Sequence, residues 1–273
     1  MSKNSKKSKL RTIAETVDRH NLYEKSVQNS ALEYKFVNKT FRKIRGRKPS
    51  ILREDFCGTA RMCREWVSRR KLNTAVGVDL DAEVLNWGRE HNIKPLDAAQ
   101  QLRIKLVENN VLTAKTEKAD IIMAMNFSYQ LFKDRASLGN YFKRVREYLV
   151  DDGVFFLDAY GGYEAFKEIT ERTHHKKFTY VWEQAKYNPV NGDMTCHIHF
   201  EFADGSKMKK AFSYSWRLWT LPEIQELLHE AGFKKVTIYW EGSDKKGEGN
   251  GEFKPTTKAD ADAGWVCYIA AEK

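Results

Sequence analysis

The stretch that decides the fold of this chain reads Ile51-Leu52-Arg53-Glu54-Asp55-Phe56-Cys57-Gly58-Thr59-Ala60, and a second stretch after it reads Ala75-Val76-Gly77-Val78-Asp79-Leu80-Asp81. The first is an apolar strand that enters a tight turn of small residues, from which a helix begins. The second is an apolar strand that ends in an acid. This is the layout of a nucleotide-binding βαβ unit, in which the turn lets a ligand approach backbone amides and the acid holds a ribose.

The turn is of the wrong kind for a dinucleotide. A diphosphate requires G-x-G-x-x-G so that it can lie on a helix N-terminus, whereas Gly58 stands alone between Phe56 and Ala60. Glu54 would also repel a diphosphate. A carboxylate at this position suits a ligand that has no phosphate and carries an ammonium group, and S-adenosylmethionine (SAM) has both properties.

Repeated strand–helix units predict a parallel, doubly wound sheet. The expected strands are residues 50–56, 74–79, 102–107, 119–125 and 154–157, with helices over 59–70 and 135–149 and closing strands over 234–240 and 265–271. Residues 178–219 alternate with a period of two and contain the hairpin turns Asn191-Gly192 and Asp204-Gly205, which predicts an inserted antiparallel sheet. Thr220 to Glu223 forms a capping box for a later helix, and residues 243–264 are expected to be a loop.

Over about residues 45–273 the chain resembles the class I SAM-dependent methyltransferases. Their first motif is roughly acid-x-Gly-x-Gly-x-Gly; this chain matches it at Glu54 and Gly58 and departs at the outer glycines, which are Phe56 and Ala60. The resemblance implies a Rossmann-like, seven-stranded, mainly parallel sheet with an antiparallel last strand. The antiparallel insertion is similar to the lid of small-molecule enzymes of the glycine N-methyltransferase type.

The resemblance divides the chain into five segments. They are a disordered basic tail (1–11), N-terminal helices that cap the active site (12–44), a SAM-binding core (45–165), a β lid (166–219) and the completion of the core (220–273).

The family's cofactor contacts transfer to the ends of the strands. Glu54 is expected to hold the SAM ammonium group, Asp79 the ribose, and Asn110 with Val111 the adenine. The full set of expected cofactor-binding residues is Glu54, Phe56, Cys57, Gly58, Thr59, Ala60, Asp79, Leu80, Asn110, Val111, Asn126 and Phe127.

Two interpretations are open for Asn126-Phe127-Ser128-Tyr129. Adenine and glutamine N-methyltransferases have Asn/Asp-Pro-Pro-Tyr/Phe here, but both prolines that would pre-set the backbone are missing. The alternative is that Phe127 and Tyr129 bound the methyl-transfer channel. Candidate catalytic residues are Tyr129, Tyr160, Asp158 and His20, and candidate acceptor-binding residues are Tyr23, Tyr129, Tyr160, Arg217 and Trp182. Arg217 among aromatic residues would clamp an acceptor carboxylate.

Composition limits the partners. The 273 residues carry a net charge of +10, half of it in the first eleven residues. No apolar stretch could span a membrane, and the tail lacks the apolar region of a secretory signal. The four scattered cysteines suit a reducing cytoplasm better than a disulfide or zinc framework, and His197 with His199 has no third ligand, so no metal is expected.

The sequence therefore predicts a cytoplasmic enzyme that transfers a methyl group from SAM to nitrogen or oxygen of a small molecule and leaves S-adenosylhomocysteine. One alternative is an RNA or protein methyltransferase that uses the basic tail and residues 42–48. Another is a non-catalytic protein whose altered turn has lost SAM.

Overall fold

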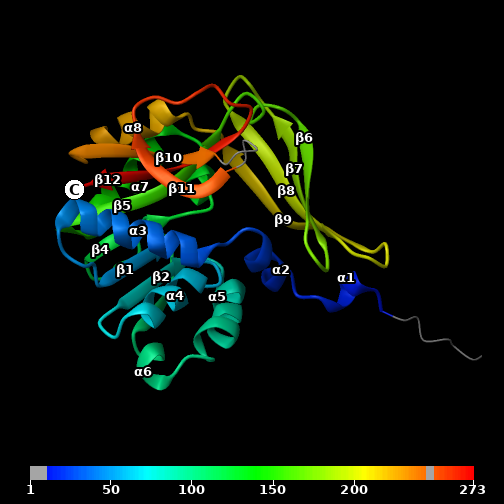
Figure 1. Ribbon diagram of the computed structural model, residues 1–273, viewed down its shortest axis with the longest axis horizontal. Helices are drawn as coiled ribbons and strands as arrows, with labels where there is room; N and C mark the ends of the chain where they lie inside the picture. The colour runs from blue at the N-terminus through cyan, green and yellow to red at the C-terminus, as the bar shows by residue number, and fades with distance from the viewer. Residues whose placement is uncertain (1–10, 244–248) are drawn as a thin grey trace, which may run out of the picture.

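The computed structural model describes residues 11–243 and 249–273, and within them the chain forms two sheets with helices around the larger one (Figure 1). The larger sheet contains β1 (Ile51–Asp55), β2 (Thr74–Asp79), β3 (Ile104–Glu108), β4 (Ala119–Ala124), β5 (Leu149–Gly161), β10 (Lys235–Ser243), β11 (Gly249–Thr256) and β12 (Trp265–Glu272). The smaller sheet contains β6 (Ile169–His174), β7 (Thr179–Tyr187), β8 (Asp193–Glu201) and β9 (Lys207–Arg217). The expected tail lies almost entirely outside the described residues.

The larger sheet has the order β11-β10-β12-β5-β4-β1-β2-β3. Strands β1 to β5 are mutually parallel, and β12 runs antiparallel to β5 with Trp265 opposite Gly161. The chain order reverses direction between β1 and β4, so their carboxyl ends flank the crevice where ligands bind in open α/β sheets. The predicted doubly wound sheet and its antiparallel last strand are therefore confirmed.

Helices cover both faces of the larger sheet. They are α1 (Ile13–Thr16), α2 (Arg19–Ser26), α3 (Ser30–Arg45), α4 (Arg61–Arg69), α5 (Ala82–Gly88), α6 (Ala98–Gln101), α7 (Arg135–Tyr148) and α8 (Leu221–Glu230), with a π-helical turn over Arg89–Ile93 and a 3-10 turn over Ser128–Leu131. One core cluster contains Phe41 of α3 and Trp66 of α4, and the other contains Phe142 of α7 and Leu228 of α8. None of these described helices is both long and apolar enough to cross a membrane.

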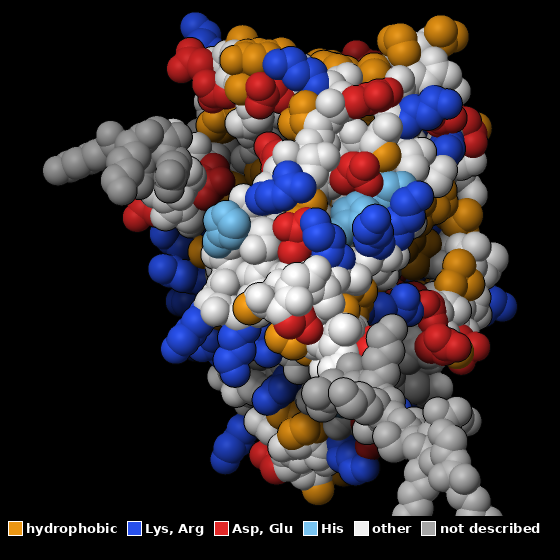
Figure 2. Space-filling model, turned by 90° about the vertical axis from the view of Figure 1, so that its right-hand side faces the viewer, with side chains coloured by type: hydrophobic (Ala, Val, Ile, Leu, Met, Phe, Trp, Pro, Cys, Tyr) orange, Lys and Arg blue, Asp and Glu red, His pale blue; other side chains and the backbone are white. Residues whose placement is uncertain are grey.

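The smaller sheet, which we call the lid, has the order β6-β7-β8-β9 with every pair antiparallel. Figure 2 views the molecule from the side where the lid lies, and mixed charges with histidines cover that side. On this polar face His197 bonds the Ser213 hydroxyl at 2.8 Å and His199 bonds the Glu183 carboxylate at 2.9 Å. Among the residues that the structure describes, no group of side chains is arranged to hold a metal ion.

Two strands differ from the expected boundaries. β11 lies in the segment 243–264 that was expected to be a loop, so the larger sheet has one strand more than predicted. Phe253 is the one large apolar side chain in β11, so no alternating pattern marks the strand; its ring packs on Tyr268 and Phe36. β6 extends the lid before residue 178, and its mostly polar, exposed side chains hide it in the same way.

Candidate active site

The turn after β1 holds non-glycine residues in left-handed backbone conformations. Phe56 has φ 58°, Gly58 has φ 52° and Ala60 has φ 57°. These are the three positions where the resembled motif has glycines, so the chain keeps the conformation of the turn without two of them. Each left-handed non-glycine residue costs about 1–2 kcal/mol. Packing offsets part of this cost, because the Phe56 ring lies 5.6 Å from that of Tyr141 and Ala60 is fully buried.

Carboxylates gather beside this turn without a cation. Burial raises the pKa of Glu54 to about 8, and the charge of Glu33 on α3 adds to the rise, while the Cys63 thiol donates a hydrogen bond to Glu54 at 3.2 Å and opposes it. Burial raises the pKa of Glu33 to about 7, with the charge of Asp158 as a further cause. Within residues 11–243 and 249–273, none of these three carboxylates forms a salt bridge. A site of this kind stabilises a positive charge placed between the carboxylates.

Helix α2 is joined to the turn by a buried carboxylate. Glu24 accepts hydrogen bonds from the Thr59 hydroxyl at 2.7 Å, from the Asn92 amide at 2.6 Å and from Arg61 at 2.8 Å. The Asn92 amide also donates to the Thr59 carbonyl at 2.9 Å. This network fixes the N-terminal helices against the start of α4, so they border the same crevice.

A second strained turn follows β4. Asn126 and Phe127 have φ 58° and 57°, and their backbone N–H groups donate to the buried Asp158 carboxylate at 2.8 and 2.9 Å. Burial raises the pKa of Asp158 to about 7, although these two hydrogen bonds favour its ionised form. Asp158 therefore holds the turn that carries Phe127, whose ring lies 4.7 Å from that of Tyr160.

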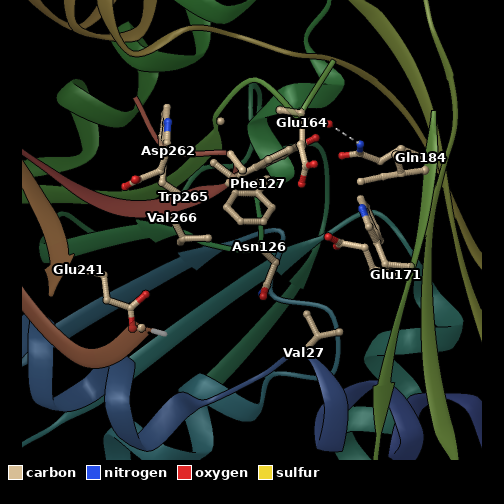
Figure 3. Close-up of a pocket in the computed structure, with 18 of the residues that line it drawn as sticks. Val27, Asn126, Phe127, Glu164, Glu171, Gln184, Glu241, Asp262, Trp265 and Val266 are labelled. Carbon is tan, nitrogen blue, oxygen red and sulfur yellow. Dashed lines mark hydrogen bonds between the residues drawn. The ribbon is translucent and has the colours of Figure 1, made fainter. Parts of the chain in front are cut away.

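A cavity of about 800 Å³ opens beside this second turn (Figure 3). The inner face of the lid supplies one wall, the turn with Phe127 and the end of β5 supply a second, and the 262–266 segment with β10 supplies a third. Aromatic side chains dominate the walls: Tyr23, Phe127, Tyr160, Tyr180, Trp182, Tyr214, Trp216, Trp240 and Trp265. The cavity therefore lies between lid and core at the carboxyl edge of the sheet.

Neither a known protein family nor a curated protein matches this sequence, but solved structures match its fold. A SAM-dependent methyltransferase from Clostridium acetobutylicum aligns with a TM-score of 0.68 at 16% identity, over 93% of this chain and 96% of its own. CalS10, an amino pentose methyltransferase from Micromonospora echinaspora, aligns with a TM-score of 0.65 at 14% identity, over 93% of this chain and 96% of its own. The sugar N-methyltransferase KedS8 from Streptoalloteichus aligns with a TM-score of 0.62 at 14% identity, over 97% of this chain and 96% of its own.

The chain has the class I SAM-dependent methyltransferase fold. In this methyltransferase fold the strands run in the order seen here, with β12 antiparallel between β5 and β10. The resemblance seen in the sequence is confirmed at the level of the fold.

The structure brings three of the predicted acceptor residues, Tyr23, Tyr160 and Trp182, together with Asn126 and Phe127, which the sequence assigns to the cofactor. Tyr23, Asn126, Phe127, Tyr160 and Trp182 all line the cavity, although they come from α2, the turn after β4, β5 and β7. The Tyr160 hydroxyl donates to the Met194 sulfur at 3.0 Å, which fixes its ring against the lid.

Four of the predicted catalytic and acceptor-binding residues lie outside the cavity wall. One is Asp158, whose carboxylate instead accepts from the Asn126 and Phe127 N–H groups. Arg217 donates to the Glu223 carboxylate at 3.0 Å and to the Lys133 carbonyl at 3.3 Å, on the face of β9 opposite Trp216, so it is not a clamp for an acceptor carboxylate. Tyr129 is fully buried in the core beneath α7, and burial raises its pKa well above the ordinary value, which disfavours the phenolate that a general base needs. His20 packs between Trp87 and Phe212 instead.

The expected cofactor residues lie at the ends of β1, β2, β3 and β4. Asp79 accepts from the Gly58 and Asp81 N–H groups at 2.7 and 3.0 Å, while Leu80 beside it is 67% exposed. Asn110 accepts from the Leu112 N–H at 2.9 Å, which leaves its amide NH₂ for a ligand. The Val111 carbonyl accepts a hydrogen bond from Arg53 at 3.3 Å. In the turn itself the Thr59 hydroxyl donates to Glu24, and Cys57 is buried against Gly77.

The sequence did not reveal several charged residues of the site. Glu33 lies on a helix with an ordinary amphipathic pattern, so nothing marks it as facing the carboxylates of β1 and β5. The same holds for the cavity-lining acids, which are Glu164, Glu171, Glu241 and Asp262. These acids come from four separate segments of the chain. The sequence signal that could have indicated two of them is the presence of polar side chains along β6 and β10.

Proposed function

We propose that this protein is an enzyme that transfers the methyl group of SAM to a nitrogen or oxygen atom of a small molecule. The observation that carries the proposal is the group of carboxyl groups Glu33, Glu54 and Asp158 at the carboxyl edge of a methyltransferase-type sheet, none of which forms a salt bridge with another described residue. Burial raises the pKa of each of these carboxyl groups, so their ionised forms are costly unless a cation lies beside them. SAM carries two such charges, an ammonium and a sulfonium.

The residues present fit SAM. Glu54 would hold the ammonium group, Asp79 the ribose hydroxyls, and Asn110 with Val111 the adenine, while the exposed Leu80 would pack on the base. Backbone amides near Gly58 would approach the cofactor. When bound, SAM supplies an electrophilic methyl group on a sulfonium.

The chain would act mainly by positioning. The turn held by Asp158 carries Phe127, whose ring lies beside that of Tyr160 at the end of β5. Both rings line the cavity and would border the channel through which a methyl group passes. Aromatic faces stabilise a cationic sulfonium, and holding two reactants in line supplies roughly 7–11 kcal/mol of the barrier. No side chain is assigned as an obligatory general base.

Two observations support a small acceptor rather than a nucleic acid. The cavity is bounded by the lid on one side. The solved structures that match the fold include an amino pentose methyltransferase and a sugar N-methyltransferase. Arg45 and Arg47, from the basic segment 42–48, form ion pairs with Glu272, Asp120 and Asp152, so they fix α3 to the sheet.

Isothermal titration with SAM and, as a matched nucleoside, with ATP tests the proposal. We expect SAM to bind at one site and ATP to give no saturable heat, because the same carboxylates that attract an ammonium repel a triphosphate. Absence of heat with SAM at high protein concentration, or tighter binding of ATP, would overturn the proposal.

A further inference from the structure

The cavity wall formed by the lid contains a cluster of neighbouring aromatic rings, tilted against one another. Tyr214 and Trp216 lie 4.4 Å apart between ring centroids, and Trp182 lies 6.1 Å from each of them. All three alternate inward on β7 and β9, so their faces border one continuous surface. Such a surface binds apolar groups and, through its π-electrons, cations.

Glu171 lies directly beside this surface. It is the cross-strand partner of Trp182 in the β6–β7 pair, so both side chains project from the same face of the lid. Figure 3 shows the Glu171 carboxylate on the lid side of the cavity, across from Glu241 on the core side. A carboxylate next to an indole provides both the charge and the aromatic face that hold an organic cation.

The charged side chains that line the cavity from the described part of the chain are all acidic. Glu164, Glu171, Glu241 and Asp262 line it, and no Lys, Arg or His lines it among residues 11–243 and 249–273. Glu241 accepts from the Gly251 N–H at 2.9 Å, which holds its carboxylate in place. Arg217, which the sequence suggests as a clamp for an acceptor carboxylate, bonds Glu223 instead and does not line the cavity. The cavity therefore attracts cations and repels acids.

A buried acceptor group also points into the cavity. Gln184 is 6% exposed, and its amide NH₂ donates to the carbonyls of Glu164 and Lys167 at 3.0 and 2.8 Å. These two bonds fix the carboxamide so that its oxygen is the end left for a ligand, and Figure 3 shows Gln184 projecting from the lid toward Glu164. An oxygen in this position accepts a hydrogen bond from an N–H or O–H group.

We propose, resting on the methyl transfer inferred above, that the acceptor is a basic amine with an apolar or ring-shaped body, bound as a cation between Trp182, Glu171 and Gln184. For transfer, the ammonium first loses a proton to solvent. Its nitrogen lone pair then forms the new N–C bond as the C–S bond breaks and its electron pair returns to sulfur. The methylated product carries the positive charge again, and the same aromatic surface stabilises it.

Three nearly isosteric probes test the charge preference: 2-phenylethylamine (a cation), 2-phenylethanol (neutral) and 3-phenylpropanoate (an anion). Binding is measured by titration to the SAM-saturated protein. We expect the cation to bind at least tenfold tighter than the neutral probe and the anion to bind weakest, with the cation alone weakened by raising NaCl from 0.05 to 0.5 M.

Variants separate this inference from the proposed function. Glu171→Gln and Trp182→Leu should each weaken the cation at least fivefold and leave SAM affinity unchanged, whereas Glu168→Gln, at an exposed position off the cavity, should change neither. Equal binding of cation and neutral probe with normal SAM affinity would overturn the amine inference alone. Failure of SAM itself to bind would overturn the proposed function.

Discussion

Replacing Glu54 by Gln should stabilise the protein without ligand and weaken its binding of SAM. The pKa of Glu54 is 4.5 in an ordinary environment and about 8 in the fold, because burial and Glu33 disfavour its charge. The folded state therefore binds more protons than the unfolded state over pH 5 to 8, so stability falls as pH rises through this window. Glu54 alone then lowers the free energy of unfolding by about 2–3 kcal/mol between pH 5 and pH 7.

Glu54→Gln removes this pH-dependent loss of stability, since a neutral amide does not ionise. The amide oxygen can still accept a hydrogen bond from the Cys63 thiol. Urea unfolding at several pH values should show the variant about 2–3 kcal/mol more stable at pH 7 and less dependent on pH. Its SAM affinity should fall about 10- to 100-fold, because a hydrogen bond to a charged group is worth about 1.5–3 kcal/mol. Glu226→Gln, on an exposed face of α8, is the control. A Glu54→Gln protein that is less stable than the parent at pH 8, or that binds SAM equally well, would refute this reasoning.

Further predictions concern the two turns and the core. Tyr129→Phe should keep full activity and stability, because the buried Tyr129 hydroxyl has no hydrogen-bond partner among residues 11–243 and 249–273. A large loss of kcat would instead show that Tyr129 takes part in the reaction. Asp158→Asn leaves one side-chain oxygen to accept from the two N–H groups of Asn126 and Phe127. Thermal unfolding should therefore show that the free energy of unfolding falls by about 1–3 kcal/mol, and kcat should drop. An unchanged kcat would contradict the positioning role of Asp158. Ala60→Gly should relieve left-handed strain and stabilise the protein by up to about 1 kcal/mol, while Ala60→Val should destabilise it; the opposite order in urea unfolding would show that the turn is unstrained.

The parallel core was predictable because its signals are local. Apolar strands that end in an acid or a small-residue turn, such as those ending at Asp55 and Asp79, recur along the chain and lie at matching ends of adjacent strands. The capping box at Thr220 and Glu223 is also present as predicted. These features depend on residues a few positions apart, which a sequence displays directly.

The acceptor side was less predictable because it is assembled from distant segments. Arg217 and Trp216 are neighbours in sequence, yet alternation places only Trp216 in the cavity, and the sequence does not say which face of the lid is inward. Tyr129 follows the turn at Phe127, but the 3-10 turn rotates it into the core. Glu33 enters the site only because α3 packs against β5 and α4, which brings its charge close to Glu54 and Asp158.

The most direct test of the central claim is a crystal structure with S-adenosylhomocysteine. We expect its ammonium group within hydrogen-bond distance of the Glu54 carboxylate, its ribose at Asp79, and its sulfur facing the cavity beside Phe127 and Tyr160. A molecule bound elsewhere, or with its amino group away from Glu54, would contradict the account.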